Sequence, residues 1–361
     1  MKMQILNFLT WLAMPLTLVA IVDDWFLRPG RRLAALPGES RDPHWLRVVY
    51  TVLPIAILGA IVRLLTSERL DFSLVLALVL LVSAIIWALD RFLLAPMRVR
   101  RATAAGVAAN AVALPVTVDY ARSFLPVAAV VLLVRSFIFE PFRIPSDSMM
   151  PTLLDGDFII VNKYAYGLRL PVLNQKFLEV GAPQRGDVVV FRYPPDPAVN
   201  YIKRLVGLPG DTVTVQNDQL IINGKPVPVA DQGRYNDGCY LNMHLGEELL
   251  GMHRHNTLSC HSSSYIGIPT VASCNRSNGR SYQCDDSEPA DQPDQNDKFD
   301  MQVPPGHYLM IGDNRDNSAD GRVWGFVPEE NLVGRASRIW FNWDLGRSWW
   351  PNWRRIGKHI E

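Results

Sequence analysis

Cysteine is scarce in this sequence, and no two cysteines are spaced as a zinc site requires. The 361 residues include four, at Cys239, Cys260, Cys274 and Cys284, with no CxxC pair among them. All four lie in the polar half of the chain, where an even number favours disulfides in a compartment outside the cytoplasm. Sequence proximity suggests the pairs Cys239–Cys260 and Cys274–Cys284, but three pairings are possible, and four unpaired thiols are the alternative.

An excess of charge of one sign is also missing. Lys and Arg number 36 against 35 Asp and Glu, which gives a net charge of +1 at pH 7. Binding of nucleic acid through bulk charge needs a strongly basic surface, so we expect no nucleic-acid partner. None of the seven histidines stands in a strand–turn setting beside a candidate nucleophile. A Ser-His-Asp triad is assembled in space and is not excluded by sequence, but it has no positive support here.

Metal-binding patterns are incomplete. His253-x-His255 with Cys260 and His261 is irregularly spaced, and no carboxylate motif accompanies this group. The stretch 316–321 resembles the start of a calcium-binding EF-hand loop, but its twelfth position is Val327, where a bidentate Glu is required. We therefore expect neither a metal nor a cofactor.

Long apolar runs, in contrast, crowd the first part of the chain, and we expect residues 1–140 to form a membrane region. The Arg-rich segments 23–47 and 90–123 alternate with the short segment 66–71, whose only basic residue is Arg69. Because positively charged loops stay in the cytoplasm, the N-terminus and everything after residue 140 are expected on the outer side. Four runs approach the ~20 residues that cross a bilayer, and these predicted transmembrane helices are about 5–22, 48–65, 72–89 and 124–139.

Two alternatives to this topology are possible. The Ala-rich stretch 102–118 would reverse the orientation if it crossed the bilayer, but Asn110 and Pro115 interrupt it. The first apolar run could be a cleaved signal peptide, but no small-x-small site follows it around Val22.

After residue 140 the pattern changes to short alternating or β-branched runs separated by turn signals, among which Asn223-Gly224 is a strong hairpin cue. This pattern predicts a mostly antiparallel β-domain made of residues 141–228 and 301–361. Between them, residues 229–300 hold all four cysteines and few strand patterns, and their tail 285–300 is acidic and expected to be loop-like. We interpret 229–300 as a disulfide-stapled inserted subdomain without a catalytic part.

Tryptophan is concentrated near the C-terminus, at Trp340, Trp343, Trp349, Trp350 and Trp353. Indole rings with basic side chains suit the lipid headgroup layer, while ordinary core aromatics are the alternative. The accompanying basic residues are Arg347, Arg354, Arg355 and Lys358.

The best candidate nucleophile lies directly after the fourth predicted span, in Pro141-Phe142-Arg143-Ile144-Pro145-Ser146-Asp147-Ser148-Met149-Met150-Pro151. Prolines restrict the backbone around two nearby serines. Ser148 can attack a carbonyl, while its own amide and the hydroxyl of Ser146 can point at one oxyanion. Taken alone the signal is weak, because Ser-x-Ser is usually a turn.

A candidate general base appears in Asn200-Tyr201-Ile202-Lys203-Arg204-Leu205-Val206. Lys203 lies among apolar neighbours, which destabilise its charged ammonium form. The neutral amine can then accept the proton of a serine hydroxyl. The common alternative is a surface lysine paired with a carboxylate.

A third polar segment, Gly312-Asp313-Asn314-Arg315-Asp316-Asn317-Ser318-Ala319-Asp320-Gly321-Arg322, reads as a network of turns. Asp313, Arg315, Asp320 and Arg322 could pair with one another and brace Ser318. The hydroxyl of Ser318 would then orient a neutral lysine.

These three segments, in their order and spacing, resemble the conserved boxes of type I signal peptidases, membrane serine proteases with a Ser/Lys dyad. The resemblance spans about residues 85–225 and 300–345. It implies a catalytic β-domain that removes signal peptides from exported preproteins. It also implies a multi-pass protein of the bacterial inner membrane, with the catalytic domain on the periplasmic side. Its partners would be signal peptides, the lipid bilayer and, by proximity, the export machinery.

The resemblance also assigns roles. Ser148 would be the nucleophile and Lys203 the general base, with Ser146 and the Ser148 amide as the oxyanion hole and Ser318 orienting Lys203. Shallow apolar pockets would admit small side chains, in agreement with cleavage after Ala-x-Ala. The residues matched to those pockets are Phe142, Ile144, Met149, Leu153, Val190, Tyr201 and Ile202.

The sequence departs from the family pattern at several positions. Asp147 stands where the family usually has Gly, Asn200 replaces a residue that is often acidic, and residues 1–70 add two predicted spans. Two rival functions remain: a membrane-tethered Ser/Lys protease dedicated to one substrate, and a tethered β-domain that only binds peptides.

Overall fold

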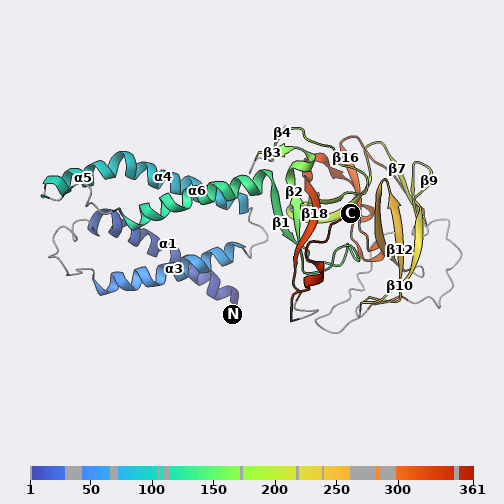
Figure 1. The fold of residues 1–361 in the computed structure, drawn as a ribbon, viewed down its shortest axis with the longest axis horizontal. Coiled ribbons are helices and arrows are strands. Elements are labelled where there is room, and N and C mark those ends of the chain that lie inside the picture. The colour runs from blue at the N-terminus through green and yellow to red at the C-terminus, as the bar shows by residue number, and fades with distance from the viewer. Residues whose placement is uncertain are drawn as a thin grey trace. The chain divides into compact units, whose positions relative to one another are not determined.

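The computed structural model of the chain (Figure 1) describes residues 2–28, 43–65, 72–104, 106, 108, 114–170, 174–216, 219–237, 240–260, 282–284, 298–344 and 349–361. The chain divides into two compact units, Met1–Val134 and Arg135–Glu361. The first unit is helical and the second is built mainly of strands, and each is described by itself.

Apolar helices make up the first unit, in agreement with the sequence. Three described helical runs are long and apolar enough to cross a membrane: Asn7–Leu27, Leu74–Ala104 and Val116–Phe137. At the other predicted span the described apolar run, His44–Ile57, is shorter, so a fourth crossing stays a prediction. The elements are α1 Lys2–Val22, η1 Asp23–Leu27, α3 His44–Leu65, α4 Phe72–Leu89, η2 Asp90–Leu94, α5 Ala95–Ala104 and α6 Val116–Phe137.

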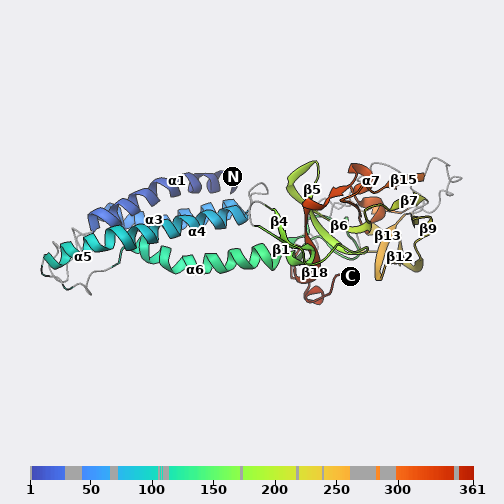
Figure 2. The ribbon, with the colours of Figure 1, turned by 90° about the horizontal axis from the view of Figure 1, so that it is seen from above.

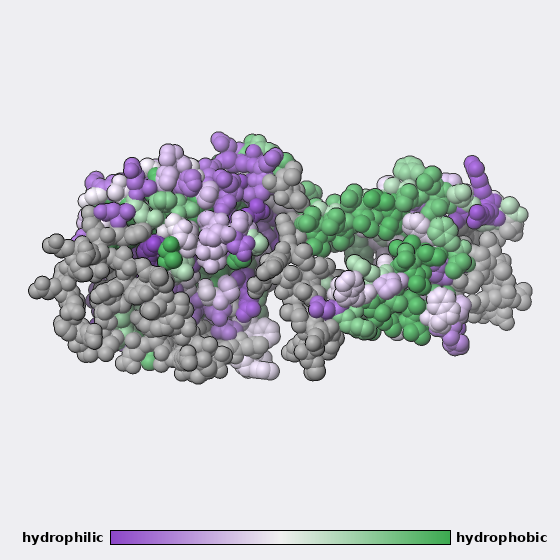
Figure 3. Space-filling model, turned by 180° about the vertical axis from the view of Figure 1, so that it is seen from behind, coloured by the Kyte–Doolittle hydropathy of each residue, from purple (hydrophilic) through white to green (hydrophobic). Residues whose placement is uncertain are grey.

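Side chains of these helices are largely apolar on the outside, and polar contacts occur between helices, among them one that joins Asp24 to Thr117. Apolar residues gather over the helices in Figure 3. Many of them are exposed, as Trp11 is at 75%. Gly59 allows α3 to approach α1, because a Cβ atom there would lie 2.7 Å from Leu9 Cβ. The buried Asp24 carboxylate accepts hydrogen bonds of 2.8 and 2.9 Å from the amide and hydroxyl of Thr117. This contact connects the end of the first helix with the start of α6.

The second unit is organised around a seven-stranded sheet in which all neighbouring strands are antiparallel. This confirms the predicted mostly antiparallel β-domain. In spatial order the strands are β1 Phe139–Arg143, β2 Asp157–Asn162, β18 Leu332–Asn342, β5 Val188–Tyr193, β6 Asp196–Gly207, β16 His307–Ile311 and β17 Val327–Pro328.

Smaller sheets accompany this one, and Figure 2 shows β7, β9, β12, β13 and β15 gathered at one side of the unit. Asn223 and Gly224 both have positive φ and form the two-residue turn of a hairpin, which confirms the hairpin cue. The strands of these sheets are β3 Leu168–Arg169 with β4 Lys176–Leu178; β15 Lys298–Gln302, β7 Thr212–Gln216, β8 Gln219–Ile222 and β9 Lys225–Pro226; β10 Val229–Tyr235, β12 Met243–Leu250 and β13 His253–Ser259; and β11 Tyr240–Leu241 with β14 Tyr282–Gln283. Short helical turns are η4 Lys163–Tyr166, η5 Arg315–Asn317, α7 Gly321–Trp324, η6 Glu329–Asn331 and η7 Trp353–Arg355.

The segment 229–300 is richer in strands than its sequence suggests. Strands β10, β12 and β13 form a three-stranded sheet. Only one face of this sheet is buried, so polar residues can occupy the other face, and these polar residues weaken the strand pattern in the sequence. Residues 298–300, which we expected to be loop-like, begin β15, while 285–297 lie outside the described residues.

A disulfide joins Cys260 to Cys284 across 24 residues of sequence. This differs from the pairs that proximity in sequence suggests, because strand pairing brings two distant segments together. Strand β13, which ends next to Cys260, pairs with β12, and the amide of Cys284 donates to Leu241 O, just before β12, at 2.9 Å. Cys239 and Cys274 lie outside the described residues.

The C-terminal tryptophans are exposed, with Trp349 at 78% and Trp350 at 73%. The sequence placed Arg355 among basic residues that suit the lipid headgroup layer, but the structure differs. Arg355 is buried and donates to both oxygens of the buried Asp157 carboxylate at 2.8 and 2.5 Å. Arg355 therefore anchors the C-terminal segment to β2 and is not available to lipid headgroups.

Candidate active site

Ser148 lies in a tight turn between strands β1 and β2. The turn belongs to the loop 144–157, whose two ends are joined by a hydrogen bond of 2.8 Å from the amide of Ile144 to Asp157 O. Within it, the amide of Met150 donates to Asp147 O at 3.1 Å, and Met150–Pro151 is a cis peptide. The turn holds Ser148 at 8% exposure.

Lys203 lies on β6, opposite Val189 of β5. Its side chain is 4% exposed, as the apolar sequence around it predicts. The ammonium Nζ lies 2.6 Å from Ser148 Oγ and also donates to the carbonyl of Ile202 at 3.0 Å. The fold thus brings together the two groups that the sequence placed 55 positions apart.

Burial sets the protonation of Lys203. Desolvation lowers the pKa of Lys203 from 10.5 to about 8, against the opposing effects of Asp320 and Asp313. The Arg322 guanidinium adds to the lowering. A substantial neutral fraction of amine is therefore present at mildly alkaline pH, which is what a general base requires.

Ser146 is on the same turn as Ser148, with its Oγ 3.4 Å from Ser148 Oγ. A hydroxyl at this distance can reach an oxyanion formed on a carbonyl that Ser148 attacks. The neighbouring Asp147 contributes its backbone oxygen, which accepts a hydrogen bond of 3.1 Å from Asn314 Nδ2. The backbone amide of Asn314 also donates to Ser148 O at 3.1 Å. The third polar segment is therefore hydrogen-bonded to the backbone of the Ser148 turn.

Asp313 and Arg315, which we expected to pair within their own segment, have partners elsewhere. Arg204, the residue after Lys203, donates to both oxygens of Asp313 at 2.7 Å each. Arg315 donates to Glu248 of β12 at 2.7 Å. No sequence pattern points to Glu248, whereas Arg204 directly follows Lys203, and its place beside the candidate base is a signal for a role at the site.

Asp320 and Arg322 do pair, through hydrogen bonds of 2.9 and 2.8 Å. Asp320 also accepts from the amide of Gly312 at 2.9 Å. Burial would raise the pKa of Asp320, but the Arg322 guanidinium holds it below its ordinary value, so the carboxylate stays charged.

Ser318 is fully buried beside Gly312. A Cβ atom on Gly312 would collide with the Ser318 side chain and lie 2.6 Å from Ser148 O. Ser318 Oγ makes no hydrogen bond of acceptable geometry among the described residues, although it lies close enough to Asp320 to help lower the pKa of that carboxyl. Ser318 is adjacent to the turn of Ser148, but no hydrogen bond to Lys203 Nζ is formed within the described part of the chain.

The residues predicted to line apolar pockets fall in two clusters. Tyr201 packs with the cluster around Phe191, and its ring centroid is 5.6 Å from Lys203 Nζ. The other six form or border one buried cluster; they are Phe142, Ile144, Met149, Leu153, Val190 and Ile202.

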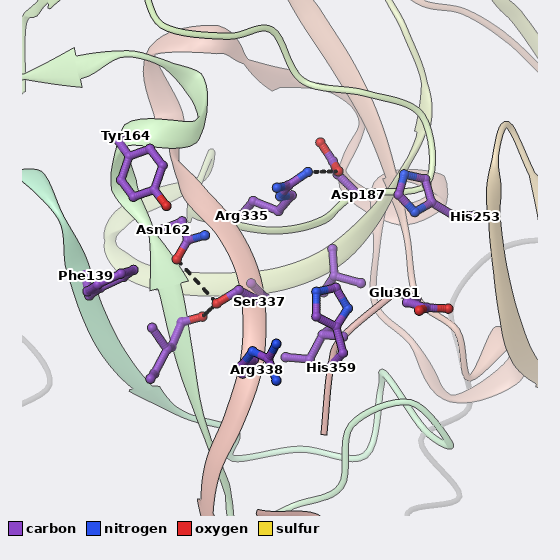
Figure 4. Close-up of a pocket in the computed structure, with 15 residues that line it drawn as sticks. Phe139, Asn162, Tyr164, Asp187, His253, Arg335, Ser337, Arg338, His359 and Glu361 are labelled. Atoms are coloured by element: carbon purple, nitrogen blue, oxygen red, sulfur yellow. Dashed lines mark hydrogen bonds and ion pairs between the residues drawn. The ribbon is translucent and has the colours of Figure 1, made fainter. Parts of the chain in front are cut away.

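A cavity of about 370 Å³ occurs elsewhere in the β unit (Figure 4). Polar contacts in its wall include Arg335 to Asp187 at 3.5 Å and Ser337 to Asn162 at 3.3 Å. Neither Ser148 nor Lys203 lines it. The cavity is therefore separate from the candidate active site.

Comparison with known proteins decides the family. The model of the family described as signal peptidase, peptidase S26, matches residues 117–341. The Signal peptidase I of Pseudomonas fluorescens is 46% identical over 255 residues, covering 67% of this chain and 79% of the relative. The Signal peptidase I of Pseudomonas aeruginosa is 43% identical with the same coverage. The chain belongs to the signal peptidase family, peptidase S26.

Membership confirms the resemblance and makes the chain a serine endopeptidase, a hydrolase. The S26 match contains all three polar segments, including Ser148, Lys203 and Ser318, and it contains the inserted strands β10, β12 and β13. Residues 1–116, with the first predicted spans, lie outside the match.

Proposed function

We propose that this protein removes N-terminal signal peptides from exported preproteins, with Ser148 as nucleophile and Lys203 as general base. The observation that carries the proposal is the 2.6 Å contact between Lys203 Nζ and Ser148 Oγ, both buried. A lysine with a pKa of about 8 supplies the neutral amine that such a pair requires. The names of the relatives in the S26 family support the substrate class.

The first step forms an acyl-enzyme. In the reactive state the Ser148 hydroxyl donates to the neutral Lys203 amine, which takes the proton as Oγ bonds to the scissile carbonyl carbon. When the tetrahedral intermediate collapses, the carbon–nitrogen bond breaks. The Lys203 ammonium returns the proton to the leaving amine, which is the new N-terminus of the mature protein.

The second step releases the signal peptide. Water attacks the Ser148 ester, Lys203 accepts a proton from it, and collapse returns the proton to Ser148 Oγ. In both steps the negative oxygen would lie between the Ser148 amide and the Ser146 hydroxyl. Ser318 would act as a positioning residue for Lys203, through its place beside Gly312 and the Ser148 turn.

Substrate selection would combine small pockets with the location of the site. Shallow pockets bordered by the predicted residues would admit Ala and reject larger side chains, which favours Ala-x-Ala sites. Counted from Ile144, the Ser148 turn begins seven residues after the end of α6 at Phe137. Proximity to the bilayer would therefore place the nucleophile where the cleavage site of a signal peptide emerges.

The remaining parts of the proposal concern organisation. The catalytic β-domain would be formed by residues 141–228 and 301–361, with 229–300 as a disulfide-containing insertion. The helices would anchor the protein in the bacterial inner membrane as a multi-pass protein with this domain in the periplasm, close to the export machinery. Lipid contact would involve the apolar faces of the helices and the exposed C-terminal tryptophans.

Cleavage of several unrelated preproteins by the purified full-length protein in detergent tests the proposal. We expect the wild type and the surface control Lys225→Ala to process each preprotein, because Lys225 is exposed on β9. Ser148→Ala and Lys203→Ala are expected to process none at a measurable rate. Processing by either variant would contradict the assigned roles.

The same assay tests the rival of a dedicated protease. Cleavage of a single preprotein among many would identify a processing protease with one substrate. The other rival, a domain that only binds peptides, disagrees with membership of a serine endopeptidase family.

A further inference from the structure

The inserted hairpin β12–β13 packs directly against the third polar segment. The amide of Leu258 donates to Asp313 O at 2.9 Å, and Leu258 forms a parallel bridge with Asn314. Two residues later the amide of Cys260 donates to the Asp316 carboxylate at 2.5 Å. The end of β13 therefore runs alongside the backbone that holds the Ser148 turn.

Glu248 and His255 are cross-strand partners on this hairpin, and both point into the protein. Glu248 is 1% exposed and His255 is 6% exposed. Burial would raise the pKa of Glu248, but Arg315 brings it below its ordinary value. Burial, followed by the nearby Arg204 guanidinium, lowers the pKa of His255 and so favours the neutral ring.

The charges that face His255 are balanced without a proton on its ring. Glu248 and Asp313 supply two negative charges, while Arg204 and Arg315 supply two positive ones. His255 Nε2 lies 3.4 Å from Glu248 Oε1 and 3.9 Å from Asp313 Oδ1. The ring thus lies close to both carboxylates of a buried cluster that consists of Glu248, His255, Asp313, Arg204 and Arg315.

The cluster is held together mainly by opposite charges. Glu248 Oε1 and His255 Nε2 face each other at 3.4 Å, and Arg315 reaches Glu248 Oε2 at 2.7 Å. An uncharged residue at position 248 would therefore leave the Arg315 charge buried near the Ser148 turn without its partner.

Two routes connect this cluster with the Ser148–Lys203 pair. Along the first, Asp313 is bound by Arg204, the neighbour of Lys203 on β6. Along the second, Glu248 binds the guanidinium of Arg315, and the backbone carbonyl of Arg315 accepts a hydrogen bond of 2.5 Å from Arg322. Arg322 in turn holds Asp320, and both influence the pKa of Lys203.

We propose that Glu248 and His255 of the inserted hairpin are positioning residues for Ser148 and Lys203, acting through Arg315 and Asp313. The insertion, which the sequence suggested had no catalytic part, then carries part of the support of the active site. This inference rests on the proposed function.

Steady-state cleavage of a preprotein by the full-length protein tests the inference. Glu248→Gln keeps the shape of the side chain and removes the charge that balances Arg315. We expect kcat to fall about tenfold with KM unchanged within about twofold, since misplacement of reacting groups slows chemistry more than binding. His255→Gln is expected to lower kcat in the same way.

The matched control is Glu247→Gln, one position earlier on β12, where the side chain contacts Gln232 at the surface. We expect its kcat and KM to equal those of the wild type. Unfolding curves for each variant fix the folded fraction at the assay temperature. If Glu248→Gln does not fold, Glu248→Asp keeps the charge but shortens the reach to Arg315, and the same fall in kcat is expected.

The inference is wrong if both Gln variants behave like Glu247→Gln. It is also wrong if the loss of activity equals the loss of folded protein, or if KM changes in place of kcat. Ser148→Ala in the same assay distinguishes a failure of the proposed Ser/Lys mechanism from a failure of the positioning role alone. If Ser148→Ala still cleaves, the proposed mechanism fails, and if it is inactive while Glu248→Gln is normal, only the positioning role fails.

Discussion

Arg204 and Asp313 are joined by two hydrogen bonds of 2.7 Å, and each side chain is 1% exposed. The guanidinium has further acceptors in Gly186 O at 2.7 Å and Glu361 O at 2.8 Å. The pair connects strand β6, which carries Lys203, to the polar segment that holds the Ser148 turn. Asp313 also accepts from Thr152 at 2.5 Å, which adds a direct link to the residues after the nucleophile.

Asp313→Asn is expected to lower the free energy of unfolding by about 3–5 kcal/mol, because it leaves the Arg204 charge buried and uncompensated. Urea unfolding of the purified protein in detergent, followed by tryptophan fluorescence, measures the change. The control is Glu329→Gln, which removes a partly exposed partner of Lys176 and is expected to change stability by at most about 1 kcal/mol. Equal effects of the two substitutions would refute the importance of the buried pair.

Ser146→Ala tests the proposed oxyanion hole. Removal of one donor to an oxyanion typically lowers kcat about 10²–10³-fold, with little effect on KM because the donor acts in the transition state. Steady-state kinetics on one preprotein give both constants. A kcat within a few-fold of the wild-type value would show that the Ser146 hydroxyl, 3.4 Å from Ser148 Oγ, does not stabilise the oxyanion.

Gly312→Ala is expected to lower kcat at least about tenfold, because the new methyl group would displace Ser318 and the carbonyl of Ser148. For comparison, a Cβ atom at Gly306 meets no atom within 4 Å, although its φ of +69° disfavours alanine. Gly306→Ala should therefore reduce stability by about 1 kcal/mol and leave kcat unchanged in folded protein. Normal kinetics for Gly312→Ala would show that this close approach does not matter to the reaction.

The disulfide Cys260–Cys284 makes a direct prediction for peptide mapping. Proteolysis without reduction should release the peptides that contain these two residues as one linked species. The double variant Cys260→Ser/Cys284→Ser should lose about 2–4 kcal/mol of stability, as expected for a loop of this length. Recovery of Cys239 linked to Cys260 would contradict the pairing.

Local patterns in the sequence predicted local structure well. Asn223-Gly224 gave the β8–β9 turn because few residues adopt positive φ without strain. The burial of Lys203 followed from its apolar neighbours on β6. Its contact with Ser148 was expected only through the resemblance to a known family, since 55 positions separate the two residues.

Long-range pairs could not be predicted in the same way. Arg204 could pair with any of several carboxylates, and only the folded sheet selects Asp313. Glu248 and His255 lie in a segment with few strand patterns, so nothing in the sequence connected them with Arg315. The disulfide partner of Cys260 likewise depends on strand pairing that proximity in sequence does not reveal.

The pH dependence of cleavage tests the central claim most directly, namely that the neutral amine of Lys203 is the base. Burial lowers the pKa of Lys203 to about 8, so the reactive neutral form increases as pH rises through this value. Single-turnover cleavage by the full-length protein from pH 6 to pH 10 should therefore rise with a midpoint near 8, while Lys203→Arg, which stays protonated, should be inactive throughout. A rate that is flat across this range, or cleavage by Lys203→Arg, would contradict the account.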